Sequence, residues 1–318
     1  VLFYVLDDTG FGQLSPYGGL IEVPNLERVA KRGVIYTNVH TTGLCSPTRA
    51  SILTGRNHHK AAMGSISEWS TGYPGYNARA PFETGFLSEI LKEQGFNTFC
   101  VGKWHLGFES PNIPNDRGFD YFKGFLGDMM DDYWTHLRGG ENWMRLNREV
   151  IDPEGHATDL FTDWTIQYLE KRKEITQPFF LYLAYNAPHF PIQPPERFLR
   201  KVQEREPGLS EKRAKNVAFI EHLDASIGKV MEYLRTAGLL EHTLIVFTSD
   251  NGGALRYEQS NGKLRGGKQD MYEGGIRVPA FITWKGTIRE GSHSNTPWML
   301  MDLLPTFCDL SGQDIPEE

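Results

Sequence analysis

Short apolar runs of strand length alternate along this chain with longer amphipathic segments. Residues 1–6, 179–185 and 244–248 are almost continuously apolar, which is typical of strands that are buried on both faces of a sheet. The segment 211–236 repeats its apolar residues every three or four positions, which predicts a long helix, and Gly238 follows its end. This alternation predicts an α/β fold built on a largely parallel sheet.

The same patterns predict the remaining elements and one large domain. A chain of 318 residues is near the upper limit of what one hydrophobic core supports, so we expect a single domain over 1–318. The segment 109–152 is rich in Gly, Asp, Asn and aromatic residues, and we expect an irregular excursion over one end of the sheet, with 131–136 as weak candidates for contacts to a substrate. Further strands are predicted at 34–39, 96–101 and 278–284, and further helices at 24–32, 87–94, 156–173 and 299–310.

Clusters of polar residues follow directly on four of the predicted strands. In an open α/β sheet, ligands bind at the carboxyl ends of the strands, and parallel strands bring those ends to one edge. The sequence therefore predicts an active site at this edge, formed by residues that lie far apart in the chain. The clusters are Asp7-Asp8, Lys103-Trp104-His105, Pro188-His189 and Asp250-Asn251.

Four of these residues are suited to bind a hard cation. Asp7, Asp8, Asp250 and Asn251 supply carboxylate and amide oxygens, and three carboxylates packed together repel one another unless a cation lies between them. Oxygen ligands suit Ca²⁺ or Mg²⁺ better than zinc, because no group of thiolates and imidazoles accompanies them. Taken alone, Asp7-Asp8 is better explained as a strand-end turn, and Asp250-Asn251 is equally well explained as a glycine-bearing loop. Together they predict a divalent-metal site.

A second set of residues is suited to bind an oxyanion. A tetrahedral oxyanion needs hydrogen-bond donors and positive charge around its oxygens, both for binding and in the transition state. Histidine is the natural proton carrier near neutral pH. The lysines and His189 also have ordinary interpretations as solvated or loop residues. The candidates are Arg49, Lys103, His105, His189 and Lys268.

The chain has three cysteines, and one of them has an unusual setting. Cys100 and Cys308 lie in apolar segments and are predicted to be small buried hydrophobic residues, and three cysteines do not form a disulfide framework. Cys45 instead lies between the predicted strand 34–39 and a short helix, near a turn where catalytic groups commonly occur. It opens the run Cys45-Ser-Pro-Thr-Arg49, which continues into Leu-Thr-Gly-Arg. An isolated run of this kind is better explained by a buried cysteine beside a turn proline, because five-residue patterns recur by chance.

These motifs occur in the order found in formylglycine-dependent sulfatases. Together with Lys268 and Glu273-Gly274-Gly275, they make the chain resemble an arylsulfatase-type enzyme of the alkaline-phosphatase-like superfamily over nearly its whole length. The resemblance implies a central, mostly parallel sheet flanked by helices on both faces. Thr48 departs from the more usual Ser of the cysteine signature but keeps a hydroxyl. Family members generally continue into a C-terminal subdomain, which we expect to be absent or truncated here because the chain ends at Glu318.

The resemblance also implies a role for each candidate residue. A formylglycine-generating enzyme oxidises Cys45 to formylglycine, whose hydrate is the nucleophile, and Arg49 positions the modified residue. Lys103 and Lys268 grip the sulfate, His105 acts on the hydrate, and His189 assists near the leaving group. The metal is usually Ca²⁺, with Mg²⁺ as the alternative, and its ligands are Asp7, Asp8, Asp250, Asn251 and an oxygen of the modified Cys45.

The implied reaction is a double displacement on a sulfate monoester. One hydroxyl of the hydrate attacks sulfur and expels the alcohol, and sulfate then leaves as the second hydroxyl becomes a carbonyl. An aryl sulfate, an alkyl sulfate and a sulfated carbohydrate all fit the motifs. Two other interpretations stay open: a phosphonate or phosphate ester hydrolase with the same nucleophile, and a non-catalytic sulfatase-like binding protein with an unmodified Cys45.

Composition bears on two further questions. The net charge of −7 and the lack of a basic run argue weakly against nucleic-acid binding, and no apolar stretch is long enough to predict a membrane span. The resemblance implies that the substrate is a small-molecule or glycan sulfate ester. Calcium-dependent sulfatases often act outside the cytoplasm, so the resemblance implies a periplasmic, extracellular or lysosome-like compartment.

Overall fold

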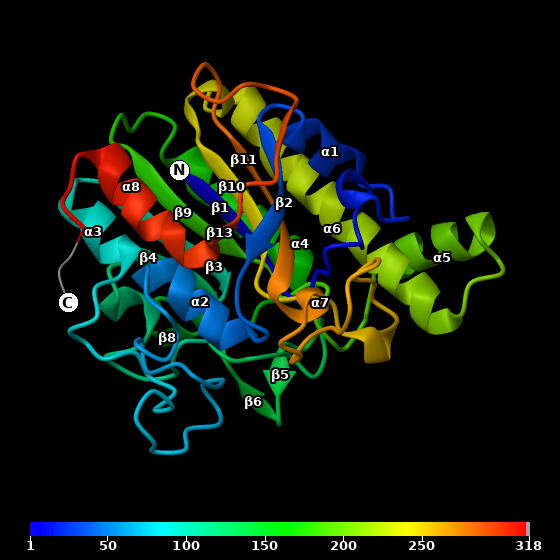
Figure 1. Ribbon diagram of the computed structural model, residues 1–318, viewed down its shortest axis with the longest axis horizontal. Helices are drawn as coiled ribbons and strands as arrows, with labels where there is room; N and C mark the ends of the chain where they lie inside the picture. The colour runs from blue at the N-terminus through cyan, green and yellow to red at the C-terminus, as the bar shows by residue number, and fades with distance from the viewer. Residues whose placement is uncertain (316–318) are drawn as a thin grey trace.

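An eleven-stranded sheet forms the centre of the computed structural model, which describes residues 1–315 (Figure 1). The central strands are longer than those at one edge, where two short antiparallel strands complete the sheet. A separate two-stranded sheet pairs β5 (Leu137–Arg138) with β6 (Glu141–Asn142). From edge to edge the main sheet contains β12 (Ser292–Ser294), β2 (Val34–His40), β11 (Arg277–Thr283), β10 (Ile245–Ser249), β1 (Leu2–Leu6), β9 (Phe179–Ala184), β3 (Asn97–Lys103), β4 (Tyr121–Phe125), β7 (Met144–Leu146) and β8 (Glu149–Val150), and β13 (Trp298–Met299) also pairs with β2.

The centre of the sheet is parallel, as the sequence predicts. β1 pairs in parallel with β9 and β10, and β3 pairs in parallel with β9 and β4. β11 runs antiparallel to both of its neighbours, β10 and β2. Its direction follows from α7 (Glu273–Ile276), which leads directly into it at the carboxyl edge of the parallel strands, with no crossover helix between them. The carboxyl ends of β1, β2, β3, β9 and β10 therefore lie at one edge.

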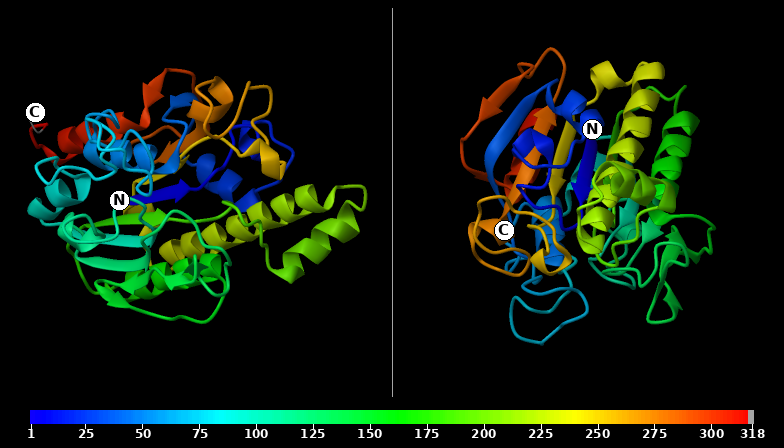
Figure 2. Two further views of the ribbon diagram at one scale, coloured as in Figure 1. Left: turned by 90° about the horizontal axis from the view of Figure 1, so that it is seen from below. Right: turned by 90° about the vertical axis from the view of Figure 1, so that its right-hand side faces the viewer.

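Helices cover both faces of the sheet and bury two separate cores (Figure 2). Alternate residues of β1 belong to different cores: Tyr4 and Leu6 to the core on one face, and Phe3 and Val5 to the core on the other. Burial on both faces explains why the central strands are apolar throughout. The first group of helices is α1 (Pro24–Ala30), α4 (Ala157–Lys171), α5 (Glu196–Arg205) and α6 (Glu211–Thr236), and the second is α2 (Cys45–Thr54), α3 (Leu87–Glu93) and α8 (Leu303–Ser311).

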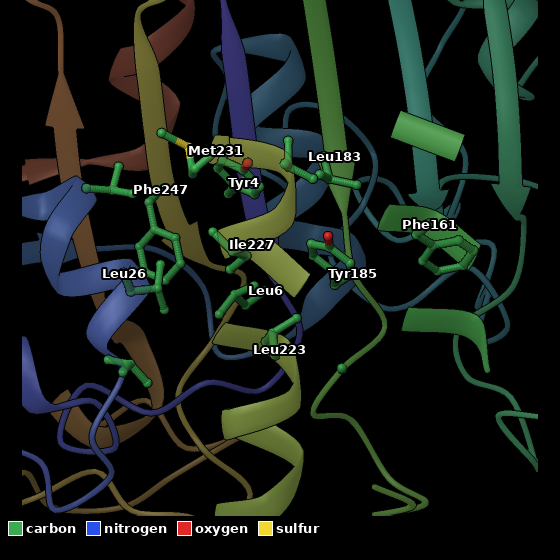
Figure 3. Close-up of a cluster of buried hydrophobic side chains, with 14 of the residues drawn as sticks. Tyr4, Leu6, Leu26, Phe161, Leu183, Tyr185, Leu223, Ile227, Met231 and Phe247 are labelled. Atoms are coloured by element: carbon green, nitrogen blue, oxygen red, sulfur yellow. The ribbon is translucent and has the colours of Figure 1, made fainter. Parts of the chain in front are cut away.

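The longest helix supplies much of the first core. Leu223, Ile227 and Met231 of α6 lie one turn apart and point towards the sheet, where they meet side chains of β1, β9 and β10 (Figure 3). The predicted bounds of this helix, 211–236, are those observed. The other predicted helices and strands are found within a few residues of their expected ends. Among the described residues, none of the helices is long and apolar enough to cross a bilayer.

The prediction for residues 109–152 is wrong in one respect. This segment is not only an excursion, because β4 pairs in parallel with β3 and the strands β7 and β8 extend the sheet beyond it. These strands have two to five residues, too few for an alternating pattern to emerge. Gly124, which suggests a loop, lies against Gly102 of β3, where an added Cβ would meet the carbonyl oxygen at 2.0 Å. The helix α5 was not predicted either.

An acidic side chain on α6 provides the cap that α1 lacks. Val23 precedes α1 and offers no side-chain acceptor to its first N–H groups. The buried carboxylate of Asp224 instead accepts hydrogen bonds from the backbone N–H groups of Asn25 (3.1 Å) and Leu26 (2.8 Å), and from the side-chain amide of Asn25 (2.8 Å). This contact joins two helices that are far apart in the sequence, since Leu26 and Asp224 are separated by 198 positions.

We expect Asp224→Ala to lower the free energy of unfolding by about 1–3 kcal/mol, because it leaves buried N–H donors without an acceptor. Urea denaturation checks this value. The matched control is Glu232→Ala on the same helix, whose exposed side chain pairs with Arg235 and whose loss is expected to cost less than about 0.5 kcal/mol. Equal effects of the two changes would contradict the capping role.

Candidate active site

The polar clusters that follow the central strands meet at one edge of the sheet. Asp7 and Asp8 follow β1, Lys103 ends β3, and Asp250 and Asn251 follow β10. All five side chains are buried. Parallel pairing of β1 with β10 carries their ends to the same level, because Leu6 lies opposite Ser249. Five more residues join this group from other segments. They are His105 from the loop after β3, His189 from the loop after β9, Cys45 and Arg49 from α2, and Lys268 from the loop before α7.

The acidic residues form the centre of the site. Asp8 donates its backbone N–H to Asp250 Oδ1 (3.2 Å), and Asn251 Nδ2 donates to Asp8 Oδ1 (2.8 Å). Asp7 Oδ1 and Asn251 Oδ1 are buried without a hydrogen-bond partner among the described residues. Ligand atoms of Asp7, Cys45 and Asp250 lie within 4.8 Å of one another. Unpaired buried oxygens in a cluster of carboxylates fit a bound cation.

The electrostatics of this centre also favour a cation. Burial raises the pKa of Asp7 well above its ordinary value, and the neighbouring Asp250 carboxylate raises it further, whereas Lys103 acts in the opposite direction. This shift expresses the cost of placing like charges together away from water. A divalent cation between the carboxylates removes that cost, so these residues could hold a metal.

Cys45 is the first residue of α2, and its side chain is buried beside the acidic centre. Burial by itself raises the pKa of the Cys45 thiol, but the positive charges of Lys103, His105 and Lys268 outweigh burial and lower the pKa to about 6. These three positive charges therefore favour an anionic group at the position of the Cys45 sulfur.

Thr48 performs a structural role through its hydroxyl. Its Oγ1 lies 2.8 Å from the hydroxyls of both Thr41 and Thr42, and it accepts a hydrogen bond from the backbone N–H of Thr42 (3.2 Å). These bonds tie the first turn of α2 to the segment that follows β2. The position needs a hydroxyl, so threonine serves here in place of the more usual serine.

Arg49 lies one turn along α2 and connects this helix to two strands. Its Nε and Nη2 donate to Asp250 Oδ2 at 3.1 and 2.8 Å, and its Nη1 donates to the carbonyl of Lys103 at 3.0 Å. The guanidinium is fully buried. The contacts hold the start of α2 against the ends of β3 and β10, which places Cys45 beside the carboxylates.

Both lysines of the site contact carboxylates. Lys103 Nζ bonds to Asp7 Oδ2, and Lys268 Nζ lies 2.8 Å from Asp8 Oδ1 and 3.0 Å from Asp8 Oδ2. Lys103 is fully buried, whereas the side chain of Lys268 is 9 % exposed and that of His189 10 %. Lys268 and His189 therefore keep some contact with solvent, whereas Lys103 has none.

His189 presents one defined nitrogen to the site. Its Nδ1 lies 2.7 Å from the carbonyl oxygen of Phe190 and donates to it, and its Nε2 lies 3.7 Å from Asp8 Oδ2. Burial and the charge of Lys268 lower the pKa of His189 to about 3, although Asp8 opposes the shift. The ring is neutral near pH 7, with the lone pair of Nε2 directed into the site.

Sequence reasoning missed Glu68. Its Oε2 lies 2.9 Å from His105 Nε2, and the neighbouring Ser67 donates its hydroxyl to the carbonyl of His105 (2.9 Å). Burial alone would lower the pKa of His105, but the Cys45 thiolate and the Glu68 carboxylate raise it to about 9. Glu68 lies in an irregular segment with no periodic pattern, so no local signal could have identified it.

Tyr133 supports the loop that carries His189. Its buried hydroxyl lies 2.8 Å from the carbonyl oxygen of Asn186 and 3.0 Å from that of His189. It thus fixes the backbone of the loop that carries His189. The weak expectation that residues 131–136 contact a substrate receives no support from this residue.

Comparison with known proteins identifies the family. The family model described as Sulfatase matches residues 1–313. This chain belongs to the sulfatase family. It is 32% identical over 343 residues to the N-acetylgalactosamine-6-sulfatase of Homo sapiens, an alignment that covers 100% of this chain and 63% of that protein. It is 31% identical over 329 residues to arylsulfatase J of Mus musculus, with 100% of this chain and 53% of that protein covered. The chain thus spans less than two thirds of these relatives.

Solved structures agree with the assignment and confirm the alkaline-phosphatase-like fold. The crystal structure of Ps i-CgsB in complex with k-i-k-neocarrahexaose superposes with a TM-score of 0.91 at 30% identity, and covers 99% of this chain and 72% of that one. The phosphonate monoester hydrolase SpPMH of Silicibacter pomeroyi superposes with a TM-score of 0.73 at 21% identity over 99% of this chain and 74% of that one. The second likeness concerns the fold alone.

We expect Tyr133→Phe to destabilise this sulfatase-family protein by about 1–3 kcal/mol, because the buried carbonyls of the His189 loop lose their donor. Urea denaturation measures the change. The control is Tyr4→Phe, since the buried Tyr4 hydroxyl has no hydrogen-bond partner among the described residues and its removal is expected to be neutral or stabilising. The supporting role would be wrong if both variants unfolded at the same urea concentration as the unaltered protein.

Proposed function

We propose that this protein hydrolyses sulfate monoesters of carbohydrates to an alcohol and inorganic sulfate, with a formylglycine hydrate made from Cys45 as the nucleophile. The observation that carries the proposal is the position of Cys45, at the start of α2 among three carboxylates, two lysines and two histidines. Membership of the sulfatase family supports it. Two similar proteins support the carbohydrate class. One is named N-acetylgalactosamine-6-sulfatase, and the other was solved in complex with k-i-k-neocarrahexaose.

The proposal includes a calcium ion. Asp7, Asp8, Asp250 and Asn251, together with an oxygen of the modified Cys45, would be its ligands, since they supply only hard oxygens. When bound, the ion neutralises the carboxylates and raises the ionised fraction of the oxygen nucleophile. Magnesium fits the same ligand types.

The formylglycine hydrate supplies two hydroxyls on one carbon, one to attack sulfur and one to become a carbonyl as sulfate leaves. Lys103 and Lys268 bind the non-bridging sulfate oxygens through their ammonium hydrogens, which are also shared with Asp7 and Asp8. The Nε2 of His189 lies 3.7 Å from Asp8 Oδ2 and carries a lone pair in the neutral ring, so it would first take up a proton from water and then donate it to the leaving oxygen. The Nε2 of His105 is held by Glu68, so its Nδ1 exchanges a proton with the group at position 45.

Turnover of matched esters tests the proposed reaction. Protein co-expressed with a formylglycine-generating enzyme should show sulfur replaced by an aldehyde in the peptide that contains residue 45, and should hydrolyse a sulfate ester faster than its phosphate counterpart. Cys45→Ser should release one equivalent of alcohol and stop as a sulfated serine, because serine lacks the second hydroxyl. Cys308→Ala, on the buried face of α8, is the matched control and should keep steady turnover. Steady turnover by Cys45→Ser, or a preference for the phosphate ester, would sink the proposed reaction.

Metal content tests the cation site separately from activity. We expect Asp250→Asn to lose bound calcium, measured by elemental analysis after dialysis and by calorimetric titration, because one hard anionic ligand is removed from the centre. Asp309→Ala, on the exposed end of α8, should retain one equivalent. Full calcium binding by Asp250→Asn would contradict the assignment. The extracytoplasmic location implied by the resemblance stays a prediction.

A further inference from the structure

A small pocket lies beside Lys268. It has a volume of about 150 Å³, and Leu255, Arg256, Lys268 and Gln269 are among its lining residues. The two segments that form it are linked directly, since the backbone N–H of Lys268 donates to the carbonyl of Gly253 at 3.1 Å. Lys268 lines this pocket and also contacts Asp8, so the pocket and the site share this residue.

Arg256 is the exposed cation of this pocket, and its guanidinium has no hydrogen-bond or ion-pair partner within residues 1–315. It lies over the ring of Tyr257 at 4.8 Å from the ring centre. Tyr257 in turn stacks on Phe190, with ring centres 4.6 Å apart and planes inclined by 9°. Phe190 directly follows His189, so this stack leads from the leaving-group histidine out to Arg256.

The loop that carries Arg256 is held in place by buried hydrogen bonds. The Gln259 side chain is 4 % exposed; its Oε1 accepts from the N–H of Ala254 (2.6 Å), and its Nε2 donates to the carbonyl of Pro188 (3.1 Å). Asn216 Nδ2 on α6 donates to the carbonyl of Tyr257 (2.9 Å). The loop is thereby fixed to the segment that carries His189, which holds Arg256 at a set position relative to the site.

The acidic neighbours of Arg256 are bound to other groups. Asp270, which also lines the pocket, accepts the backbone N–H of Gly267 (2.8 Å) through its Oδ2. Glu258 bonds to the hydroxyl of Ser210. A guanidinium left without a carboxylate partner next to an aromatic stack is suited to a ligand that carries both an oxyanion and a ring.

We propose that Arg256, with the Tyr257–Phe190 stack, forms a subsite for a second oxyanion, carried by the sugar next to the one that loses its sulfate. This inference rests on the proposed function, which places the sulfate that is removed beside Lys268. The substrate class that the subsite would select is a glycan with charged groups on adjacent sugars. The planar guanidinium would bind the second sulfate or carboxylate through paired N–H donors, and the ring of the neighbouring sugar would lie against the stack.

Calorimetric binding to Cys45→Ala protein tests the subsite without turnover. The probes are a disaccharide sulfated on one sugar, the same disaccharide sulfated on both, and a monosulfated disaccharide whose second sugar is a uronic acid. We expect the two doubly charged probes to bind about tenfold more tightly than the first, the size of one charge-assisted contact. Adding Arg256→Ala should remove this difference, and Arg256→Lys should restore only part of it, because lysine cannot form the paired contact.

The control for general charge effects is Arg289→Ala in the same background. Arg289 is exposed and lies in the turn after β11, at the sheet edge opposite the site, so it should leave the ratio of affinities unchanged. A loss of affinity by Arg256→Ala that is equal for all three probes, or no loss at all, would overturn the subsite. A converted wild-type protein that turns over no sulfate ester would instead overturn the proposed function, while the ratio of affinities would still decide the subsite.

Discussion

Concentrated buried charge at the carboxyl edge of the sheet is the constraint on which the rest of this structure depends. Asp7, Asp8 and Asp250 lie together with almost no exposure to water. Buried like charges are tolerated only when opposite charges and hydrogen bonds compensate them. Arg49, Lys103 and Lys268 supply that compensation from three different parts of the chain. The same cationic groups that stabilise the carboxylates also create the electropositive centre around Cys45.

The sheet explains how this charge can be held in so small a volume. The parallel strands β1, β3 and β10 end at the same edge, and polar residues of the site lie at or directly after each of these ends. Residues 7 and 250 are far apart in sequence but come together because β1 and β10 are neighbours in register. Arg49 then spans from α2 to the ends of β3 and β10, so the nucleophile position depends on the sheet as well as on its own helix.

Less regular segments surround this rigid centre and are tied to it by a few polar contacts. Glu68 reaches His105, Tyr133 holds the loop of His189, and Gln259 joins that loop to the segment bearing Arg256. Each contact is made by a side chain whose position in sequence carries no periodic signal. The strands therefore position the buried charged residues of the site, and these contacts position the loops around them.

The amino-acid sequence alone determined the α/β class, the bounds of α6 and the identity of the residues that gather at the edge. Those features rest on local patterns: long periodic segments, continuous apolar strands, and polar clusters at strand ends. It did not predict β4, β7 and β8, because strands of two to five residues are too short for a pattern and glycine at 124 suggests a loop. Only the tertiary structure decided that Lys103 and Lys268 contact Asp7 and Asp8, and that Glu68 pairs with His105. The reason is physical: such contacts join residues up to 260 positions apart, and their energy depends on burial and distance, which exist only once the chain has folded.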